Sequence, residues 1–425
     1  MNEMFLSVCI VVREVRSCIL KCIDSVKDIA DEIIILNTCP YREIPDEIKN
    51  MDIPKDVKIS VYKAKWNNSY GEAKNFCLDK TKGRWVLFIN PYEELEKVNK
   101  EKLHELLRDP NVEGYFLHID NTGKILPLTE LIRLFRNRRE YRYKHRVFER
   151  ITDKGLHFVK DSGIKINSKN SIRKDENYLL ELELNENPND GYIQYVYGID
   201  LMNKKLYKES SKFFRKSEKN TNPEEIFAPH LYRCFILSLV NLKEEREAFK
   251  ILEKGMELFP FYKNFLNIEI IMNVMNIFLE KREYEEALEC TKHFEKYKNL
   301  ENQINSIKFI CYTMLKKEEE ALKILDLINK DSVYYNYMLL QRVESLWAGE
   351  RWEEAKSLLI SVKKTDDNLI SLYNLIHEVL TGKKTGNITL SHSQYQIVNM
   401  IKDDLLWLES EDKAKILTDN FNKGE

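Results

Sequence analysis

The sequence predicts an α/β domain followed by an all-helical solenoid, and three observations support this fold class. Short apolar runs alternate with amphipathic stretches over the first 90 residues, which is typical of parallel strands covered by helices. From about residue 188 onward the pattern becomes almost purely helical, and it repeats. Glycine (13) and proline (10) are scarce among the 425 residues, and this scarcity favours helices over loops.

Four apolar runs in the first domain are short enough to be buried strands. They are Phe5–Val12, Glu32–Leu36, Val57–Tyr62 and Trp85–Ile89. A helix is expected over Ser17–Asp28, where apolar residues recur on one face, and another from the capping box Ser69–Glu72 to about Lys80. Ligands of such sheets bind at the carboxyl ends of the strands, so the polar residues that follow each strand are the candidate site.

One segment recurs through the second half of the chain, with a small residue at the same place in each copy. These anchors, separated by 38, 39, 34 and 34 residues, are Ser210, Ala248, Ala287, Ala321 and Ala355. A 34-residue period with a small residue at a helix–helix contact fits tetratricopeptide repeats. Stacked helix pairs form a groove that binds peptides or protein segments. A scaffold role and a homodimer surface remain open alternatives.

The composition shifts suggest four segments. Residues 1–160 form the α/β domain, residues 161–187 a linker with a docking helix around Tyr178–Leu184, residues 188–380 the repeats, and residues 381–425 capping helices. Within the last segment, a loop over residues 380–393 precedes a final helix near Ile397–Leu408.

Charge and hydropathy argue against several classes of protein. The net charge is only −2, from 67 basic and 69 acidic residues, so no overall field indicates nucleic acid or a membrane surface. No apolar run approaches the roughly 20 residues of a membrane span. The first ten residues lack the features of a signal peptide. The eight cysteines form no C-x-x-C pair, which favours free thiols in a reducing cytoplasm and hence a cytoplasmic protein.

The order and spacing of the strands and their following motifs resemble the family 2 glycosyltransferases, in particular a bacterial subgroup with a tetratricopeptide tail. The matching segments are Leu6–Val12, Cys22–Thr38, Trp66–Asn75, Gly83–Asn90, Arg133–Asn137 and His145–Glu149. This resemblance implies a nucleotide-diphospho-sugar transferase domain of the GT-A type. The architecture is also similar to that of the hexosyltransferases that glycosylate cysteine or serine on bacteriocin peptides.

The departures from the family pattern fall on the residues that carry its chemistry. In the family an Asp-x-Asp-Glu-Glu-Leu turn holds a divalent metal against the donor diphosphate, but here Asn90 and Tyr92 replace its two aspartates. Magnesium and manganese require hard anionic oxygens, which Asn90 and Tyr92 do not supply at neutral pH. Glu93 and Glu94 remain, either as weak metal ligands or as carboxylates that favour the start of the next helix.

Other family motifs have drifted in the same way. The Lys-Asn-Glu after the first strand has become Arg13-Glu14-Val15, and the nucleotide loop after the second strand keeps only Thr38. The family's Ala-Arg-Asn has become Ala73-Lys74-Asn75, and its His-Glu has become Phe148-Glu149. The hydrophobic frame is intact, which suggests selection for the fold without selection for the usual site.

The segment Arg133–Arg150 is strongly basic, with eight arginine and lysine side chains against two glutamates. Arginine binds phosphate oxygens in bidentate fashion, so this segment could neutralise a leaving diphosphate without a metal. The alternative is a strand with a solvated basic face. Trp66 could stack on a base or sugar ring, or it could simply pack.

These considerations define a candidate nucleotide-sugar site without a metal ligand set, so we expect no cofactor and doubt a dependence on magnesium or manganese. Glu149 and Glu93 are the candidate catalytic carboxylates. The candidate nucleotide-sugar-binding residues are Arg13, Asn37, Thr38, Trp66, Lys74, Asn75, Asn90, Tyr92, Arg138 and Arg146. Two functions follow: a catalytically impaired protein that binds a peptide or protein as a scaffold, or an active, metal-independent glycosyltransferase acting on a peptide or protein held by the repeats.

Overall fold

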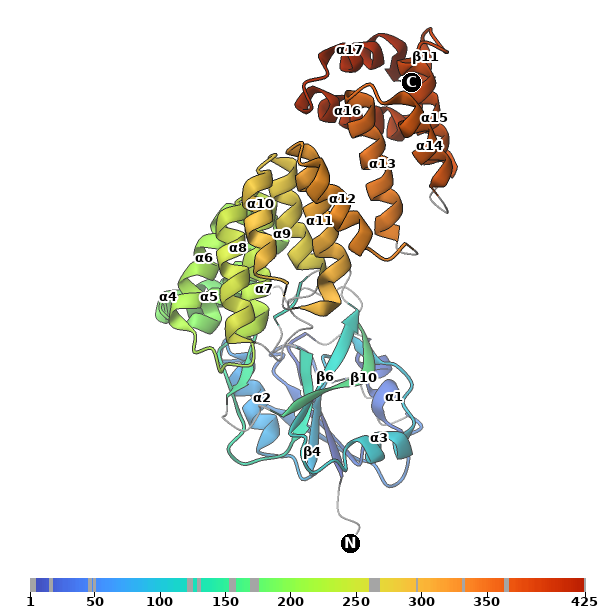
Figure 1. The fold of residues 1–425 in the computed structure, drawn as a ribbon. Coiled ribbons are helices and arrows are strands. Elements are labelled where there is room, and N and C mark those ends of the chain that lie inside the picture. The colour runs from blue at the N-terminus through green and yellow to red at the C-terminus, as the bar shows by residue number, and fades with distance from the viewer. Residues whose placement is uncertain are drawn as a thin grey trace. The chain divides into compact units, whose positions relative to one another are not determined.

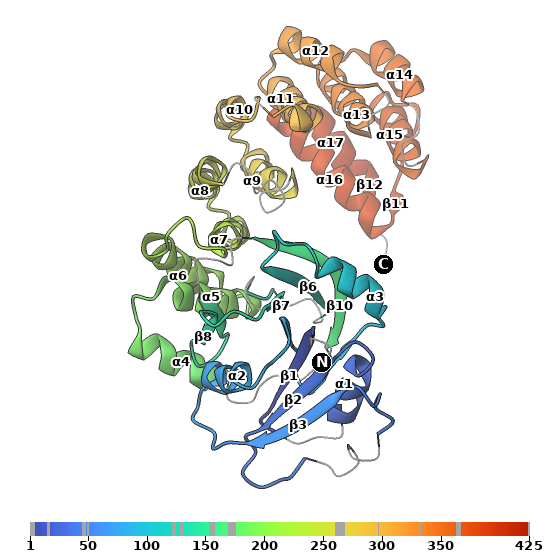
Figure 2. The ribbon, with the colours of Figure 1, turned by 90° about the horizontal axis from the view of Figure 1, so that it is seen from below.

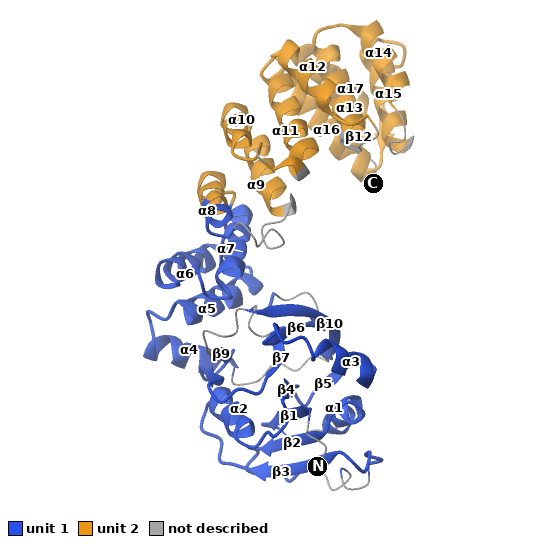
Figure 3. Ribbon diagram, turned by 60° about the horizontal axis from the view of Figure 1, so that its bottom comes forward, with its two compact units in different colours: residues 1–242, 254–265 blue, residues 243–253, 266–425 orange. Residues whose placement is uncertain are grey.

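A computed structural model describes residues 5–14, 18–44, 48, 51–120, 125–127, 131–152, 158–168, 176–259, 268–295, 297–330, 333–362 and 367–423. The chain divides into two compact units (Figure 3). Unit 1 contains residues 1–242 and 254–265, and unit 2 contains residues 243–253 and 266–425. The start of the expected helix at Ser17, and residues 169–175 of the expected linker, lie outside the described residues.

Unit 1 is built on an eight-stranded sheet with the strand order β3-β2-β1-β4-β7-β6-β10-β5. The first four strands in this order are parallel to one another, and β7 joins β4 in antiparallel orientation. The strands are β1 (Leu6–Val12), β2 (Glu32–Asn37), β3 (Lys58–Lys63), β4 (Trp85–Phe88), β5 (Glu93–Leu95), β6 (Gly114–Asp120), β7 (Ile132–Arg136) and β10 (Val159–Ser168). A separate ribbon pairs β8 (Arg142–Lys144) with β9 (Arg150–Thr152).

Helices cover both faces of this sheet (Figures 1 and 2). Helices α1 (Cys18–Val26) and α3 (Lys100–Leu106) pack on one face, where Ile19, Ile23 and Leu103 join the core. Helix α2 (Tyr70–Leu78) covers the other face. The side chains of β1 alternate between these two cores, because successive residues of a strand point to opposite faces. This double burial explains why the strand is apolar throughout.

Four helices belong to unit 1 in addition to those on the sheet: α4 (Glu176–Glu186), α5 (Gly191–Asn203), α6 (Tyr207–Asn220) and α7 (Ala228–Leu242). Helix α8 (Glu245–Leu258) is divided between the two units. The phenolic hydroxyl of Tyr192 on α5 donates a hydrogen bond to the backbone oxygen of Phe148 (2.6 Å). Asn203 exchanges two hydrogen bonds with the backbone of Ile125. The first helical pair is therefore joined to the α/β domain.

Unit 2 continues the pairs of helices. Its helices are α9 (Ile268–Glu280), α10 (Tyr284–Lys292), α11 (Glu301–Met314), α12 (Glu318–Leu327), α13 (Val333–Ala348), α14 (Trp352–Ser361), α15 (Asp367–Leu380), α16 (His392–Trp407) and α17 (Glu411–Asn420). A short ribbon of β11 (Ile388–Leu390) and β12 (Phe421–Lys423) closes the chain. The helix expected near Ile397–Leu408 is α16, which starts earlier than expected, after the capping box of Ser391 with Gln394, and it is not the final helix because α17 follows it.

The turns inside the helix pairs share one backbone conformation. Each turn has a residue with φ between 56° and 60°, and these residues are Lys205, Lys243, Arg282, Lys316 and Glu350. Their spacing along the chain equals the spacing of the predicted anchors, so the repeat is a repeat of local structure as well as of sequence. The predicted fold class, an α/β domain followed by a helical solenoid, is confirmed.

Candidate strand-end site

The polar residues at the end of β2 are held by hydrogen bonds to the backbone of the chain. The amide nitrogen and the hydroxyl of Thr38 both donate to the carbonyl oxygen of Val12, at 2.9 and 3.1 Å. The side chain of Asn37 donates to the carbonyl of Arg42 and accepts from the amide of Cys39, both at 2.9 Å. Asn37 and Thr38 are 2% and 3% exposed. Their hydrogen-bonding groups therefore shape the loop between β2 and β3.

The turn after β4 is closed by hydrogen bonds between its own residues, at the place where the family pattern has a metal site. The backbone nitrogen of Asn90 donates to one carboxylate oxygen of Glu93, and its side-chain amide nitrogen donates to the other, each at 2.7 Å. Arg133 lies 3.8 Å from the same carboxylate, which is almost completely buried. Each oxygen of Glu93 is therefore already bound by a donor from the chain. Tyr92 is partly exposed in the same turn.

These residues do not fit a divalent cation of the family type. The amide of Asn90 faces the Glu93 carboxylate through its nitrogen, so it acts there as a donor and not as a metal ligand. Across the described part of the chain, no three His, Cys, Asp or Glu side chains gather in a way that could hold a metal ion.

Arg13 and Trp66 come together at the carboxyl ends of the strands. The guanidinium of Arg13 lies over the Trp66 ring, 4.8 Å from its centre, and Tyr70 meets the same ring edge-on at 4.7 Å. The indole nitrogen of Trp66 is buried and has no hydrogen-bond partner among the described residues. A buried donor without an acceptor is rare in folded proteins. This cluster thus differs from the neighbouring loops, whose polar side chains are hydrogen-bonded within the chain.

Lys74 and Glu149 form a buried ion pair between α2 and the segment before β9. The ammonium of Lys74 is 2.8 Å from the carboxylate of Glu149, and the two side chains are 5% and 0% exposed. The rings of Phe88 and Tyr143 lie 5.3 and 4.7 Å from the same ammonium. Asn75, one residue further along α2, exchanges two hydrogen bonds with the backbone of Tyr143. Three of the predicted site residues thus join α2 to β8 and β9.

The basic segment pairs with carboxylates from distant parts of the chain. Arg138 binds Glu113 in bidentate fashion at 2.6 and 2.9 Å. Burial opposes ionisation of Glu113, but hydrogen bonds from Arg138 and Tyr141 hold the pKa of that carboxyl below its ordinary value. The register sets Arg136 opposite Trp85, the first residue of β4. Arg138 therefore lies at the opposite edge of the sheet from Asn90, which corrects the expectation that both line one cleft.

Arg146 and Arg150 of this segment lie against α4 and the residues just before α7. Arg146 binds Glu186 at 2.6 Å, and Arg150 binds Glu225 at 2.6 Å. Buried Glu183 accepts hydrogen bonds from His145 and from the amide of Arg146, both at 3.1 Å. Although burial raises it, these two donors hold the pKa of Glu183 below its ordinary value. The basic segment is thus a docking element for the first helices.

Sequence reasoning did not identify Glu113 or Glu183 as partners of this segment. A weak signal was available for Glu183, since it follows Leu179 and Leu180 at helical spacing on the face of α4 that becomes buried. No signal indicated Glu113, because an ion pair across 25 residues depends on strand register, which the sequence alone does not give.

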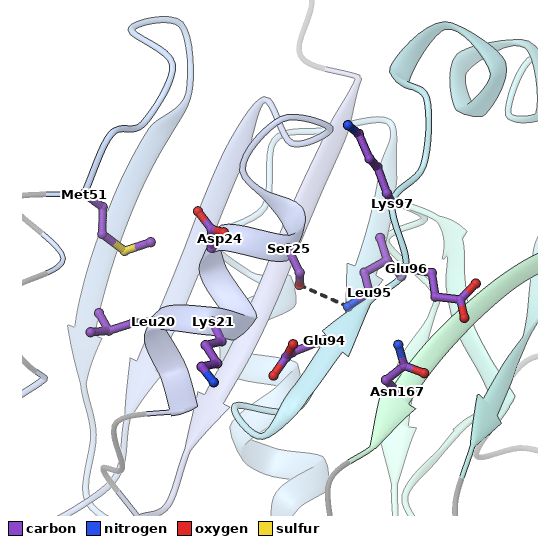
Figure 4. A pocket seen from close by; sticks show the side chains of 10 residues that line it. All are labelled: Leu20, Lys21, Asp24, Ser25, Met51, Glu94, Leu95, Glu96, Lys97 and Asn167. Atoms are coloured by element: carbon purple, nitrogen blue, oxygen red, sulfur yellow. Dashed lines mark hydrogen bonds between the residues drawn. The ribbon is translucent and has the colours of Figure 1, made fainter.

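A pocket of about 730 Å³ lies between α1, β5 and β10 (Figure 4). Its charged lining is mixed, with Lys21 and Lys97 beside Asp24, Glu94 and Glu96. The hydroxyl of Ser25 accepts a hydrogen bond from the amide of Leu95 at the pocket wall (3.0 Å). None of the predicted nucleotide-sugar-binding residues is among the described residues that line this pocket.

Comparison with known proteins agrees with this architecture. Residues 7–169 match the family model described as glycosyl transferase family 2. A TPR repeat-containing protein of Synechococcus elongatus is 28% identical over 149 residues, which are 35% of each chain. The glycosyltransferase SunS of Bacillus subtilis, described as SPbeta prophage-derived, is 36% identical over 90 residues, which are 21% of this chain and 20% of SunS. The matches thus span 35% or less of the length of these relatives.

Among solved structures, S. aureus TarS residues 1–349 in complex with UDP-GlcNAc align with 76% of this chain and 89% of TarS 1–349, at a TM-score of 0.34 and 9% identity. The fold and the strand-end residues define a transferase-type α/β domain joined to helical repeats of the tetratricopeptide kind. Its α/β part, over residues 7–169, is the part that matches the model of glycosyl transferase family 2. No helix in the described part of the chain is long and apolar enough to cross a membrane.

Proposed function

We propose that this protein is a catalytically impaired glycosyltransferase-like protein that binds a peptide or protein through its helical repeats. The observation that carries this proposal is the closed turn after β4, where Asn90 donates two hydrogen bonds to Glu93. A metal-dependent transferase needs free carboxylate oxygens at this place to hold the ion against the donor diphosphate. Here the one buried carboxylate is engaged by its own turn.

The neighbouring residues support impairment in the same way. A nucleotide that sought hydrogen bonds from Thr38 or Asn37 would compete with bonds that these side chains already make within the chain. The ammonium of Lys74 is neutralised by Glu149 inside the core. An inserted diphosphate would therefore have to break existing bonds before it gained new ones, which lowers its net affinity.

The helical repeats support the binding role. Stacked helix pairs present an extended surface on which each pair contributes a few side chains. The Synechococcus relative is named for such repeats. An α/β domain without its usual chemistry, joined to an array of this kind, is best explained as a scaffold.

One observation favours the second candidate, an active and metal-independent glycosyltransferase. Arg13 lies at the carboxyl end of β1, beside the buried indole nitrogen of Trp66. A guanidinium and an unused donor at this edge could receive an anionic, ring-containing donor without a metal. The name of SunS, a glycosyltransferase, supports the same reaction. In this candidate the repeats would hold the peptide or protein acceptor.

Titration calorimetry with a panel of nucleotide sugars separates the two candidates. We expect weak or no binding, no release of nucleoside diphosphate, and no change when Mn²⁺ is replaced by EDTA. Metal-independent binding that is lost in Trp66→Phe, which lacks the indole nitrogen, would favour the second candidate. Affinity that EDTA abolishes would contradict both candidates, because each excludes a metal site in the β4 turn.

Restoring the family carboxylates tests the metal argument directly. The double substitution Asn90→Asp and Tyr92→Asp should place two new carboxylates near Glu93, and it removes the amide donor that now satisfies Glu93. We expect the variant to be less stable than the natural chain and to regain stability with Mn²⁺, because the ion offsets the repulsion between carboxylates. Differential scanning fluorimetry with and without Mn²⁺ measures this shift.

Asn90→Ala is the matched control, since it removes the same donor without adding charge. Its melting temperature should fall but should not respond to Mn²⁺. If Mn²⁺ does not change the melting temperature of the double variant either, the backbone after β4 no longer has the shape of a metal site. We expect no sugar transfer by the double variant, because the loop at Asn37 and Thr38 remains altered.

A further inference from the structure

A pair of carboxyl groups lies inside unit 2, where α16 meets α13, with Glu344 buried and Asp404 half-buried. Glu344 on α13 is 3% exposed, and its carboxyl is hydrogen-bonded to that of Asp404 on α16. The amide nitrogen of Gln341 lies 3.3 Å from Glu344 and 3.5 Å from Asp404, so it bridges the two groups. The hydroxyl of Tyr373 on α15 donates to the other oxygen of Glu344.

Few charges are available to neutralise this pair. Among the residues that the structure describes, neither carboxylate forms an ion pair with a Lys, Arg or His side chain. The nearby cation is Arg282, which donates to the backbone oxygen of Asp403 at 3.1 and 3.2 Å. Asp403 adds negative charge beside Asp404. Glu344 is buried and Asp404 is half-buried, and two adjacent carboxylates repel each other when both are ionised, so the pair retains a proton to a higher pH than either group would alone.

The titratable groups around the pair respond to it. Burial and the neighbouring Asp404 raise the pKa of Glu344 well above its ordinary value, and burial also raises the pKa of Asp404. Burial together with the charge of Glu344 raises the pKa of Tyr373. Burial, with Asp404 contributing, raises the pKa of Tyr284 on α10 to about 12. Both tyrosines therefore stay neutral at physiological pH, and neither carries a charge that could balance the carboxylates.

The pair sits where the end of α16 meets the turns of successive helix pairs. The indole nitrogen of Trp407 donates to the carbonyl of Met314 at 3.0 Å, and the Trp407 ring lies under Arg282 at 5.2 Å. Glu409 binds Lys316 at 2.8 Å. Just beyond, Lys413 binds Glu350 at 2.6 Å. Segment 403–413 therefore contacts three equivalent turn residues, Arg282, Lys316 and Glu350, in chain order.

We propose that the end of α16, residues 403–409, is a proton-dependent latch on the helical repeats, closed when Glu344 and Asp404 share a proton. The turns of α16 before the latch pack through Val398 and Ile401 into the core of unit 2, which keeps that part of the helix in place. Opening the latch releases the contacts of residues 403–409 with the turn residues Arg282 and Lys316.

The direction of the pH effect follows from the raised pKa values. A group whose pKa is higher in the folded than in the unfolded state contributes stability that is present at low pH and lost as pH rises through the folded value. The latch should therefore be closed in mild acid and should loosen toward neutral and alkaline pH.

Hydrogen–deuterium exchange of the full chain tests the latch locally. The amides of Leu408, Glu409 and Ser410 bond to the last turn of α16, and their protection reports its closure. Between about pH 5.5 and about pH 8, after correction for intrinsic exchange, we expect their protection to fall about tenfold or more, because loss of the shared proton leaves two adjacent charged carboxylates. The protection of amides in α13 that lie away from the pair should not change with pH.

Asp404→Asn should remove this pH dependence, because its amide donates permanently to Glu344 as the shared proton does now. Glu344→Gln should do the same from the other side. Asp403→Asn is the matched control, an exposed neighbouring carboxylate, and should keep the natural pH response. The proposal is overturned if amide protection in the natural chain depends on pH no more strongly than in Asp404→Asn. It is also overturned if both neutral variants lower protection equally at both pH values, since the pair is then an ordinary structural contact.

Discussion

Replacing Lys74 by methionine should destabilise the α/β domain by about 3–5 kcal/mol, because it leaves the carboxylate of Glu149 buried without its partner. The loss should appear as a lower urea midpoint for exchange in α2 and β8, the elements that the pair and Asn75 join. Glu149→Gln should also destabilise the domain, because the amide cannot neutralise the ammonium of Lys74. Lys63→Met, in an exposed pair with Glu43, is the control and should hardly change the midpoint.

The double variant Lys74→Met and Glu149→Leu distinguishes a structural ion pair from a functional one. Replacing both charges by apolar side chains of similar size should recover most of the lost stability, because neither charge then has to be kept out of water. If Lys74 served a nucleotide instead, Lys74→Met would remove nucleotide-sugar affinity with little change in stability. That result would contradict the impaired-transferase proposal.

Substituting Gly71 by alanine should also destabilise the chain, although alanine is the better helix former. The added Cβ would overlap the backbone oxygen of His145, and a backbone atom cannot move aside as a flexible side chain can. We expect a loss of about 1–3 kcal/mol, as for other overpacked sites. Thermal unfolding, followed by circular dichroism, measures the effect.

Gly349→Ala is the matched control, because its Cβ would have its nearest contact at 3.6 Å, an ordinary van der Waals distance. That variant should unfold within a degree or two of the natural chain. If Gly71→Ala were equally harmless, the segment 144–146 would not be fixed against α2 as the hydrogen bond from Tyr70 to Arg146 indicates.

The part of the fold that the sequence predicts well is the part governed by local pattern. β1 and β2 are continuous apolar runs because both of their faces are buried, and the helix pairs show a period that their turns reproduce. Most strands after residue 90 were not predicted, although a strand was one interpretation of the basic segment Arg133–Arg150. β5 and β8 have three residues each, and β10 is mostly exposed or half-buried. None of these three strands therefore contains a long run of apolar residues.

The candidate site shows the same division. The loss of metal ligands is visible in the sequence, since Asn90 and Tyr92 occupy the two aspartate positions of the motif. What satisfies the remaining groups is not visible, because Lys74 and Glu149 are 75 residues apart and meet only through tertiary packing. Arg138 could be assigned to the correct sheet edge only once the pairing of β7 with β4 was known.

The ion pairs of Arg146 with Glu186 on α4, and of Arg150 with Glu225 just before α7, bear on how such proteins can be recombined. A crossover at residue 188, where the helical pattern begins, would separate Glu225 from Arg150 and Tyr192 from Phe148. The first compact unit instead extends to Leu242, with residues 254–265 added. Chimeras with foreign repeat arrays should therefore keep α4–α7 with the transferase-type domain and exchange modules beyond it. The set of helices that can be exchanged is therefore smaller than the sequence pattern suggests.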